Sequence, residues 1–143
     1  MKFLVLDASV AAKWYVKESD SERAQKLIDR DFLFLVPDIF FAEVANAIRK
    51  QHREDGQLDA ASVQLAVDDL VMGLEPISST VLLPRATEIA LTLGHPIYDC
   101  LYLALAERWS IDFVTADKRL RTRLGGSDWE RCTVMLADAD QIA

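Results

Sequence analysis

The chain has 143 residues, of which 51% are hydrophobic and 27% are charged, a composition typical of globular proteins rather than disordered or fibrous ones. Its length predicts a single domain over residues 1–143, with a core that needs no disulfide or metal to hold it. The net charge of −7 argues against a protein that coats nucleic acid through overall positive charge. It leaves room for a local basic patch, or for a site where metal ions supply the positive charge.

The apolar segments are short. The first, residues 3–6, is too short for the core of a signal peptide, and no apolar run reaches the length of a membrane span. Cys100 and Cys132 lie in apolar surroundings without the spacing of metal ligands, which favours reduced thiols. These features predict a cytoplasmic protein that makes no membrane contact.

Short runs rich in Val, Ile, Leu and Phe predict the strands. They are expected at residues 3–6, 33–36, 75–78, 111–115 and 132–136. Most of these runs are apolar without alternation, which is typical of strands buried on both faces of a parallel sheet.

Longer amphipathic segments between the strands predict the helices, and capping residues, prolines and glycines mark their ends. The first helix is expected from a capping box at 19–22 to Asp29, the second from Ile39 to Arg53, and the third from an Asp59 cap to just before Gly73. A fourth is expected to end at Gly94, a fifth to begin at Pro96, and a last one to cover 116–124. The resulting order, β-αα-β-αα-β-αα-β-α-β, predicts an α/β fold with three layers (α/β/α) and a mostly parallel central sheet of about five strands.

Two acidic residues follow predicted strands. Asp7 ends the first strand, and Asp117 follows the fourth by two residues. Ligands of parallel α/β sheets gather beyond the carboxyl ends of the strands, so both side chains are candidates for a site. Asp is also a common turn residue and helix cap after a strand, and that alternative stays open for each of them.

Two further acids stand on apolar helical faces. Glu43 has mostly apolar neighbours at helical spacing, and Asp99 is the only charged residue between Ile97 and Ala106. An unpaired carboxylate is costly to bury, so each needs a partner or a cation. The alternative is that each is an acid near a helix start, where the helix dipole favours it. Neither His52 nor His95 has a plausible partner in the sequence.

Four acids that surround hard cations would reconcile these positions. Mg²⁺ and Mn²⁺ prefer oxygen ligands, and such ions support phosphodiester hydrolysis by binding phosphate oxygens and lowering the pKa of an attacking water. The acids therefore suggest a metal-dependent phosphodiesterase that requires no catalytic histidine.

The sequence resembles the PIN-domain ribonucleases, and most closely the VapC-type toxins of toxin–antitoxin pairs. The resemblance rests on four blocks in order: LDASV (6–10), PDIFFAEVANAI (37–48), PIYDCLYLALAE (96–107) and TADKRL (115–120). It implies a PIN-like fold and an endoribonuclease dependent on Mg²⁺ or Mn²⁺. It also implies a homodimer that is inhibited by a cognate antitoxin protein and acts on RNA, with transfer RNA among the candidates.

Carried over to this sequence, the resemblance assigns the catalytic and metal-binding acids to Asp7, Glu43, Asp99 and Asp117. It places Ser9 and Thr115 beside them as supporting polar residues. One departure is Cys100, where the family more often has a small residue such as Ala.

Basic residues follow the last acid closely. Lys118, Arg119, Arg121 and Arg123 are candidates for contacts with RNA phosphates, and Lys13 is a weaker one. The alternative for these cations is a solvated helix face.

Two other functions compete with the nuclease. One is a PIN-like module that binds RNA or protein without cutting. The other is a phosphatase with an aspartyl-phosphate intermediate, which would need a second acid where Ser9 stands.

Overall fold

A computed structural model describes residues 1–54 and 58–142. The strands are β1 (Lys2–Leu6), β2 (Phe32–Pro37), β3 (Pro76–Ile77), β4 (Phe113–Thr115) and β5 (Thr133–Met135). The helices are α1 (Ala8–Tyr15), α2 (Ser21–Asp29), α3 (Ile39–Glu54), α4 (Ala60–Gly73), α5 (Ser79–Leu93), α6 (Ile97–Trp109) and α7 (Lys118–Arg123), with a 3₁₀ helix, η1 (Leu136–Gln141), after β5. The element order predicted from the sequence is confirmed.

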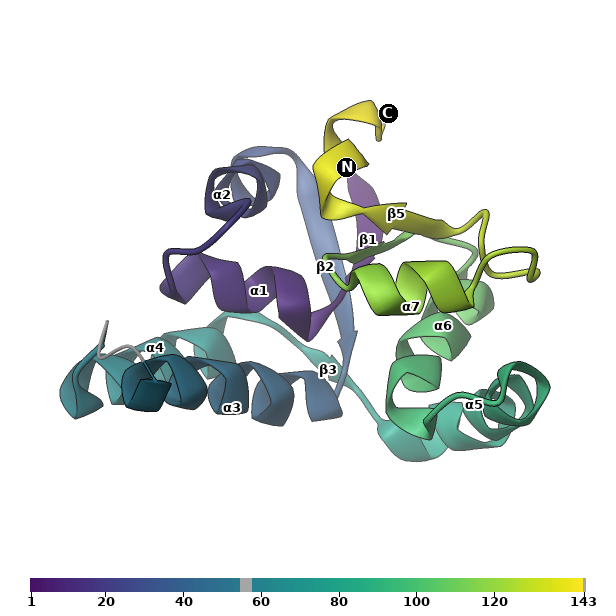
Figure 1. The fold of residues 1–143 in the computed structure, drawn as a ribbon, viewed down its shortest axis with the longest axis horizontal. Helices are drawn as coiled ribbons and strands as arrows, with labels where there is room; N and C mark the ends of the chain where they lie inside the picture. The colour runs from purple at the N-terminus through teal and green to yellow at the C-terminus, as the bar shows by residue number, and fades with distance from the viewer. Residues whose placement is uncertain (55–57, 143) are drawn as a thin grey trace.

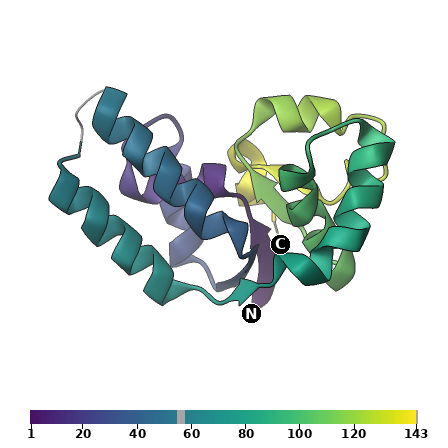
Figure 2. The same cartoon turned by 90° about the horizontal axis from the view of Figure 1, so that it is seen from below.

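The sheet has five strands in the order β3-β2-β1-β4-β5, and each neighbouring pair is parallel. Helices α1 to α4 gather on one side of the strands and α5 to α7 on the other (Figure 1), and the second view shows the same separation (Figure 2). The predicted three-layer α/β fold with a parallel sheet is confirmed.

The strands form the central layer because their apolar side chains are buried between the helices. Leu4, Val5 and Leu6 of β1 are fully buried, as the uninterrupted apolar run predicts. Tyr102 of α6 stacks on Phe113 of β4, with ring centroids 5.5 Å apart, and both side chains are buried. Helix α6 therefore packs directly against the strands, and its residues from Cys100 to Ala106 are buried, whereas Tyr98 beside Asp99 is exposed.

The topology fixes where a site can form. Because all the strands are parallel, their carboxyl ends meet at one edge of the sheet. Strand β1 is central and pairs with β4 through Leu6 and Val114, and the Asp7 backbone N–H donates to the Val114 carbonyl at 3.0 Å. The residues after β1 and those after β4 therefore lie beside each other.

Several predicted boundaries differ from the structure, and β4 and β5 are each two residues shorter than the predicted 111–115 and 132–136. The capping box at 19–22 is wrong, because α2 begins at Ser21 behind Asp20, whose backbone is left-handed (φ 64°) and whose side chain makes no capping hydrogen bond. Instead, the Ser21 hydroxyl accepts a hydrogen bond from the Glu18 N–H at 2.9 Å. Strand β3 is shorter than predicted, with only Pro76 and Ile77 paired to β2, since a proline lacks the N–H that would extend an edge ladder.

Both cysteines are free thiols, as the sequence predicts. Cys100 is fully buried in α6, and burial raises the pKa of its thiol to about 11. Within the described residues, no helix is by itself long and apolar enough to cross a membrane; α5 and α6 reach that length only as a pair bent by 116°.

Candidate active site

Asp7 follows β1, the central strand, and is buried at the carboxyl end of that strand. It occupies the N-cap position of α1, but its side chain makes no capping hydrogen bond. Its Oδ2 instead accepts hydrogen bonds from the hydroxyls of Ser9, at 2.8 Å, and Thr115, at 2.5 Å. Turn or cap chemistry therefore does not explain this side chain, which two hydroxyl groups hold in place.

Ser9 and Thr115 join the ends of β1 and β4. The Ser9 hydroxyl accepts from the Ala116 N–H at 3.1 Å, and the Thr115 hydroxyl accepts from the Asp117 N–H at 3.0 Å. Each hydroxyl thus donates to Asp7 and accepts from the backbone after β4. Both residues lie where the sequence resemblance expects them, in contact with the first acid.

Asp117 caps α7, because its Oδ1 accepts from the N–H groups of Arg119 at 2.9 Å and Leu120 at 3.1 Å. The cap alternative is therefore correct for this residue. This cap does not compete with a role in a site, because Oδ1 alone is engaged among the described residues and the cap fixes the carboxylate beside the end of β1.

Glu43 reaches the same region from α3. Its Oε1 accepts a hydrogen bond of 2.8 Å from the hydroxyl of Tyr102, whose side chain is fully buried in α6. Burial and the neighbouring carboxylates hold the pKa of the Tyr102 hydroxyl far above its ordinary value, so this group keeps its proton and remains a donor. The partner that Glu43 needs is thus a tyrosine, which sequence reasoning missed.

Asp99 lies in the first turn of α6, where the helix dipole favours an acid. Its Oδ2 also contacts Nε2 of His95 at 2.6 Å, a residue four positions earlier. The prediction that His95 has no partner is wrong. The signal was the i, i+4 spacing, which was obscured because Pro96 separates His95 from the helix.

The four acids act on one another electrostatically. Burial raises the pKa of Asp7 from 3.8 to about 6, with hydrogen bonds from Thr115 and Ser9 lowering it and the charges of Asp99 and Asp117 raising it. Burial also raises the pKa of Glu43 from 4.5 to about 7; the Tyr102 hydrogen bond opposes this, while the charges of Asp7 and Asp99 add to it. The fold therefore brings Asp99 and Asp117 within range of Asp7, and Asp7 and Asp99 within range of Glu43, where like charges repel.

The carboxylates share one further property. Each has one oxygen held by a hydrogen bond, and its other oxygen has no hydrogen-bond partner in the described part of the chain. In residues 1–54 and 58–142, no three Asp, Glu, His or Cys side chains converge closely enough to coordinate one ion as they stand. The donor set still suits a hard divalent cation, because it consists of carboxylate oxygens whose mutual repulsion a cation would relieve.

The basic residues of α7 differ in what they contact. The side chains of Lys118 and Arg119 are exposed and make no hydrogen bond or ion pair with the described residues. Together with Thr122 and Arg123 they line an open hollow of about 530 Å³. The first of these lining residues, Lys118, directly follows Asp117 in the chain.

The other three candidate cations are engaged within the chain, and Arg123 donates to the Gly94 carbonyl at 2.6 Å. Arg121 contacts the Glu130 side chain at 3.7 Å, and Lys13 donates to the Ser19 carbonyl at 2.7 Å and pairs with Glu18 at 3.4 Å. Lys118 and Arg119 are therefore the cations best placed to meet a ligand beside the acids.

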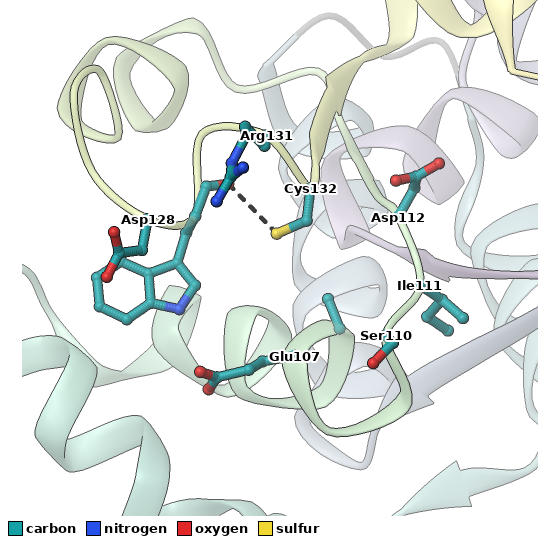
Figure 3. A pocket seen from close by; sticks show the side chains of 9 residues that line it. Glu107, Ser110, Ile111, Asp112, Asp128, Arg131 and Cys132 are labelled. Atoms are coloured by element: carbon teal, nitrogen blue, oxygen red, sulfur yellow. Dashed lines mark hydrogen bonds between the residues drawn. The ribbon is translucent and has the colours of Figure 1, made fainter.

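Figure 3 shows a second hollow, of about 420 Å³. It is lined by residues from the end of α6 and the start of β4, including Glu107 and Asp112, and by Cys132, which donates to the Trp129 carbonyl at 3.3 Å. These segments stand at the amino ends of the strands, whereas the four acids stand at the carboxyl ends. The hollow is therefore separate from the candidate site.

Comparisons with known proteins identify the family of the chain. A family model described as the PIN domain matches residues 4–123. A curated protein, ribonuclease VapC3 of Pyrobaculum aerophilum, is 32% identical over 120 residues, which cover 82% of this chain and 91% of that protein.

Solved structures are similar over nearly the whole chain. PAE2754 from Pyrobaculum aerophilum has a TM-score of 0.65 and 20% identity, covering 97% of this chain and 86% of that one. A toxin–antitoxin complex from Klebsiella pneumoniae has a TM-score of 0.63 and 14% identity, covering 93% and 97%. VapBC2 from Rickettsia felis, bound to a promoter DNA fragment, has a TM-score of 0.59 and 15% identity, covering 93% and 98%.

The family match spans well over half of the chain, and it includes the ends of β1 and β4 and the parts of α3 and α6 that carry the four acids. The chain belongs to the PIN-domain family.

Proposed function

We propose that this protein is an endoribonuclease that depends on Mg²⁺ or Mn²⁺ and hydrolyses RNA phosphodiester bonds. The observation that carries the proposal is the set of four carboxylates at the carboxyl edge of the sheet, each with one oxygen held and the other without a hydrogen-bond partner among the described residues. The name of the curated relative, a ribonuclease, supports the same reaction.

Asp7, Glu43, Asp99 and Asp117 would hold the metal. When bound there, the ion supplies charge stabilisation for the phosphate and a water of lowered pKa. Ser9 and Thr115 keep Asp7 oriented through their hydrogen bonds to Oδ2, and Tyr102 does the same for Glu43. These contacts are formed before RNA arrives, so one oxygen of Asp7 and one of Glu43 are already held in place.

The direct test is RNA cleavage by the purified protein with Mn²⁺ or Mg²⁺, over a panel of structured RNAs that includes transfer RNA. We expect new 5′ ends that appear with metal and disappear with EDTA. Metal binding without cleavage of any RNA in the panel would instead favour a non-catalytic binding module.

We further propose that the protein is the toxin of a toxin–antitoxin pair, works as a homodimer and binds an antitoxin protein. Support comes from the solved structures it resembles, two of which are toxin–antitoxin assemblies by name. Induced expression should arrest growth, and light scattering of the purified protein should give twice the mass of one chain. Normal growth with full nuclease activity would indicate a housekeeping nuclease.

Lys118 and Arg119 are the proposed contacts for RNA phosphates. Replacing both with alanine should weaken RNA binding roughly tenfold and reduce the salt dependence of the binding constant by about 0.7 in log–log slope for each phosphate that is no longer neutralised. Fluorescence anisotropy with single-stranded RNA would measure both quantities, using protein that also carries Asp7→Asn so that no RNA is cut.

Arg49 and Lys50 provide a matched control for this prediction, since they are an adjacent, exposed Arg–Lys pair on α3. Replacing both with alanine changes the net charge equally but should leave the affinity nearly unchanged. Equal losses for the two double variants would show that overall charge, and not the surface of α7, determines RNA binding.

A further inference from the structure

The connection between α5 and α6 is short and conformationally restricted. Gly94 ends α5 with left-handed backbone angles (φ 61°, ψ 40°), and the His95 N–H donates to the Ala90 carbonyl at 3.2 Å. Pro96, whose ring fixes its φ near −55°, then occupies the N-cap position of α6. His95 is therefore held between two residues with little conformational freedom.

The same connection is tied to the helix that follows Asp117. The Arg123 guanidinium at the end of α7 donates from Nη2 to the Gly94 carbonyl at 2.6 Å. A Cβ at position 94 would lie 3.3 Å from this nitrogen, so another residue there would have to displace the Arg123 guanidinium slightly, in addition to the strain of the left-handed backbone. The connection thus has a fixed position relative to α6, which carries Asp99, and to α7, which Asp117 caps.

His95 uses this position to contact one oxygen of Asp99. The side chains are 17% and 28% exposed, and Nε2 lies 2.6 Å from Oδ2. In this contact a carboxylate oxygen is the acceptor, and the Nε2–H group of the imidazole serves as the hydrogen-bond donor. No other hydrogen bond reaches Asp99 from the side chains of the described residues, so Oδ1 is left for a different ligand.

We propose that His95 is a positioning residue for Asp99, which orients the carboxylate toward the metal ion of the proposed nuclease; this inference rests on the proposed function. Hydrogen bonds from neighbouring residues to a metal-binding carboxylate fix its orientation, and their loss typically reduces metal affinity or activity by about 10- to 100-fold. His95 acts through Asp99 and needs no contact with RNA. If His95 instead competed with the ion for Asp99, its removal would strengthen metal binding.

The test is calorimetric titration of the metal-free protein with Mn²⁺. His95→Leu should raise the dissociation constant about 10- to 100-fold. His95→Gln should recover affinity to within about threefold of wild type, because the Gln side-chain amide places an N–H donor near the position of Nε2. Rescue by Gln but not by Leu is a result that a merely structural role would not give.

His52→Leu is the matched control, since His52 lies on α3 and contacts the Leu58 carbonyl. It removes a histidine in the same way and should leave Mn²⁺ affinity unchanged. Thermal unfolding in EDTA, followed by circular dichroism, would verify that every variant is folded.

The outcomes separate the two proposals. Mn²⁺ binding by wild type, equally tight or tighter in His95→Leu, would overturn the positioning role and leave the nuclease proposal intact. Equal losses for His95→Leu and His95→Gln would also overturn it, because the donor would then not be the feature that matters. A wild-type protein that binds no Mn²⁺ would overturn the proposed function and this inference with it.

Discussion

Asp7→Asn is expected to lower RNA cleavage by about 10³-fold or more while raising the stability of the metal-free protein. Cleavage falls because the amide removes a negative charge from the centre of the four acids. Stability rises because burial of the charge raises the pKa of Asp7 from 3.8 to about 6, which corresponds to a cost of about 3 kcal/mol at neutral pH.

The expected gain in stability is smaller than that cost. The Asn carbonyl can still accept from Ser9 and Thr115, but its N–H₂ group replaces Oδ1, which has no partner in the described part of the chain. No fully buried side-chain oxygen lacks a partner among the described residues, so the Oδ1 position reaches solvent and the amide there costs less than a fully buried unsatisfied group, about 1–3 kcal/mol. The net gain should therefore lie between about 1 and about 3 kcal/mol. Initial cleavage rates with Mn²⁺, and urea unfolding in EDTA, measure the two effects.

Asp112→Asn is a suitable control for both measurements. Asp112 precedes β4 at the opposite edge of the sheet, and its side chain is 34% exposed with a long ion pair to Lys2 at 3.8 Å. The substitution should change neither the cleavage rate nor the stability by much. Retention of cleavage in Asp7→Asn would exclude this acid from the reaction. A loss of stability in the same variant would show that the charge of Asp7 does not destabilise the metal-free fold.

The opposite effects of Asp7→Asn illustrate a trade-off in the site. The Ser9 and Thr115 hydroxyls lower the pKa of Asp7, but burial outweighs them. A core of this kind would be more stable with a neutral residue at position 7. The charge is best explained by a cation that binds there, which agrees with the proposed function.

Much of the fold could be predicted from sequence because it depends on local patterns. The apolar runs of β1 and β4 indicate strands buried on both faces, and parallel strands bring their carboxyl ends together. Asp7 and Asp117 could therefore be placed near each other without a structure. The Asp59 cap was also predictable, since the side chain accepts from the Ser62 N–H at 2.8 Å as local capping rules require.

The partners of the two helical acids could not be predicted in the same way. Glu43 meets Tyr102 across 59 positions of the chain, and that contact depends on how α3 and α6 pack against the sheet. A buried tyrosine at core spacing gives no sign of which acceptor its hydroxyl will reach. Patterns within one helix indicate the buried face, whereas the hydrogen-bond partner is set by tertiary packing.

His95 is a different kind of omission, because its partner is only four residues away. Helical spacing would have related it to Asp99, but the glycine and proline on either side indicate a loop, where side-chain directions are not periodic. The left-handed backbone of Gly94 and the contact from Arg123 determine the direction of the imidazole. The glycine and the proline correctly predicted a turn, and for that reason the contact between His95 and Asp99 was not predicted.

The stability of the metal-free protein should fall as the pH rises between about 4 and 7, and metal should reverse this fall. Asp7 and Glu43 both have a raised pKa in the folded state, from 3.8 to about 6 and from 4.5 to about 7. In this window the folded state holds more protons than the unfolded state, so each added step in pH destabilises it. Above about pH 8 both groups are ionised in both states, and their contribution becomes constant.

Other acids titrate in the same range, so the effect is best measured as a difference. Urea unfolding in EDTA would be followed from about pH 4 to about pH 8 for wild type and for the double variant Asp7→Asn, Glu43→Gln. The wild type should lose about 3 kcal/mol relative to the double variant from Asp7 alone, with Glu43 adding in the same direction. A difference that is flat, or that has the opposite sign, would contradict the raised pKa values.

Addition of Mn²⁺ at about pH 8 completes the prediction, because the ion binds ionised carboxylates and relieves their repulsion. At a concentration of 100 times its dissociation constant, it should stabilise the wild type by about 2.7 kcal/mol. The double variant, which lacks two of the four carboxylates, should gain much less, and metal should stabilise the wild type less at about pH 5 than at about pH 8. Equal stabilisation of both proteins would place the ion elsewhere. If the prediction holds, the charges that weaken the metal-free fold are the same ones that bind the metal.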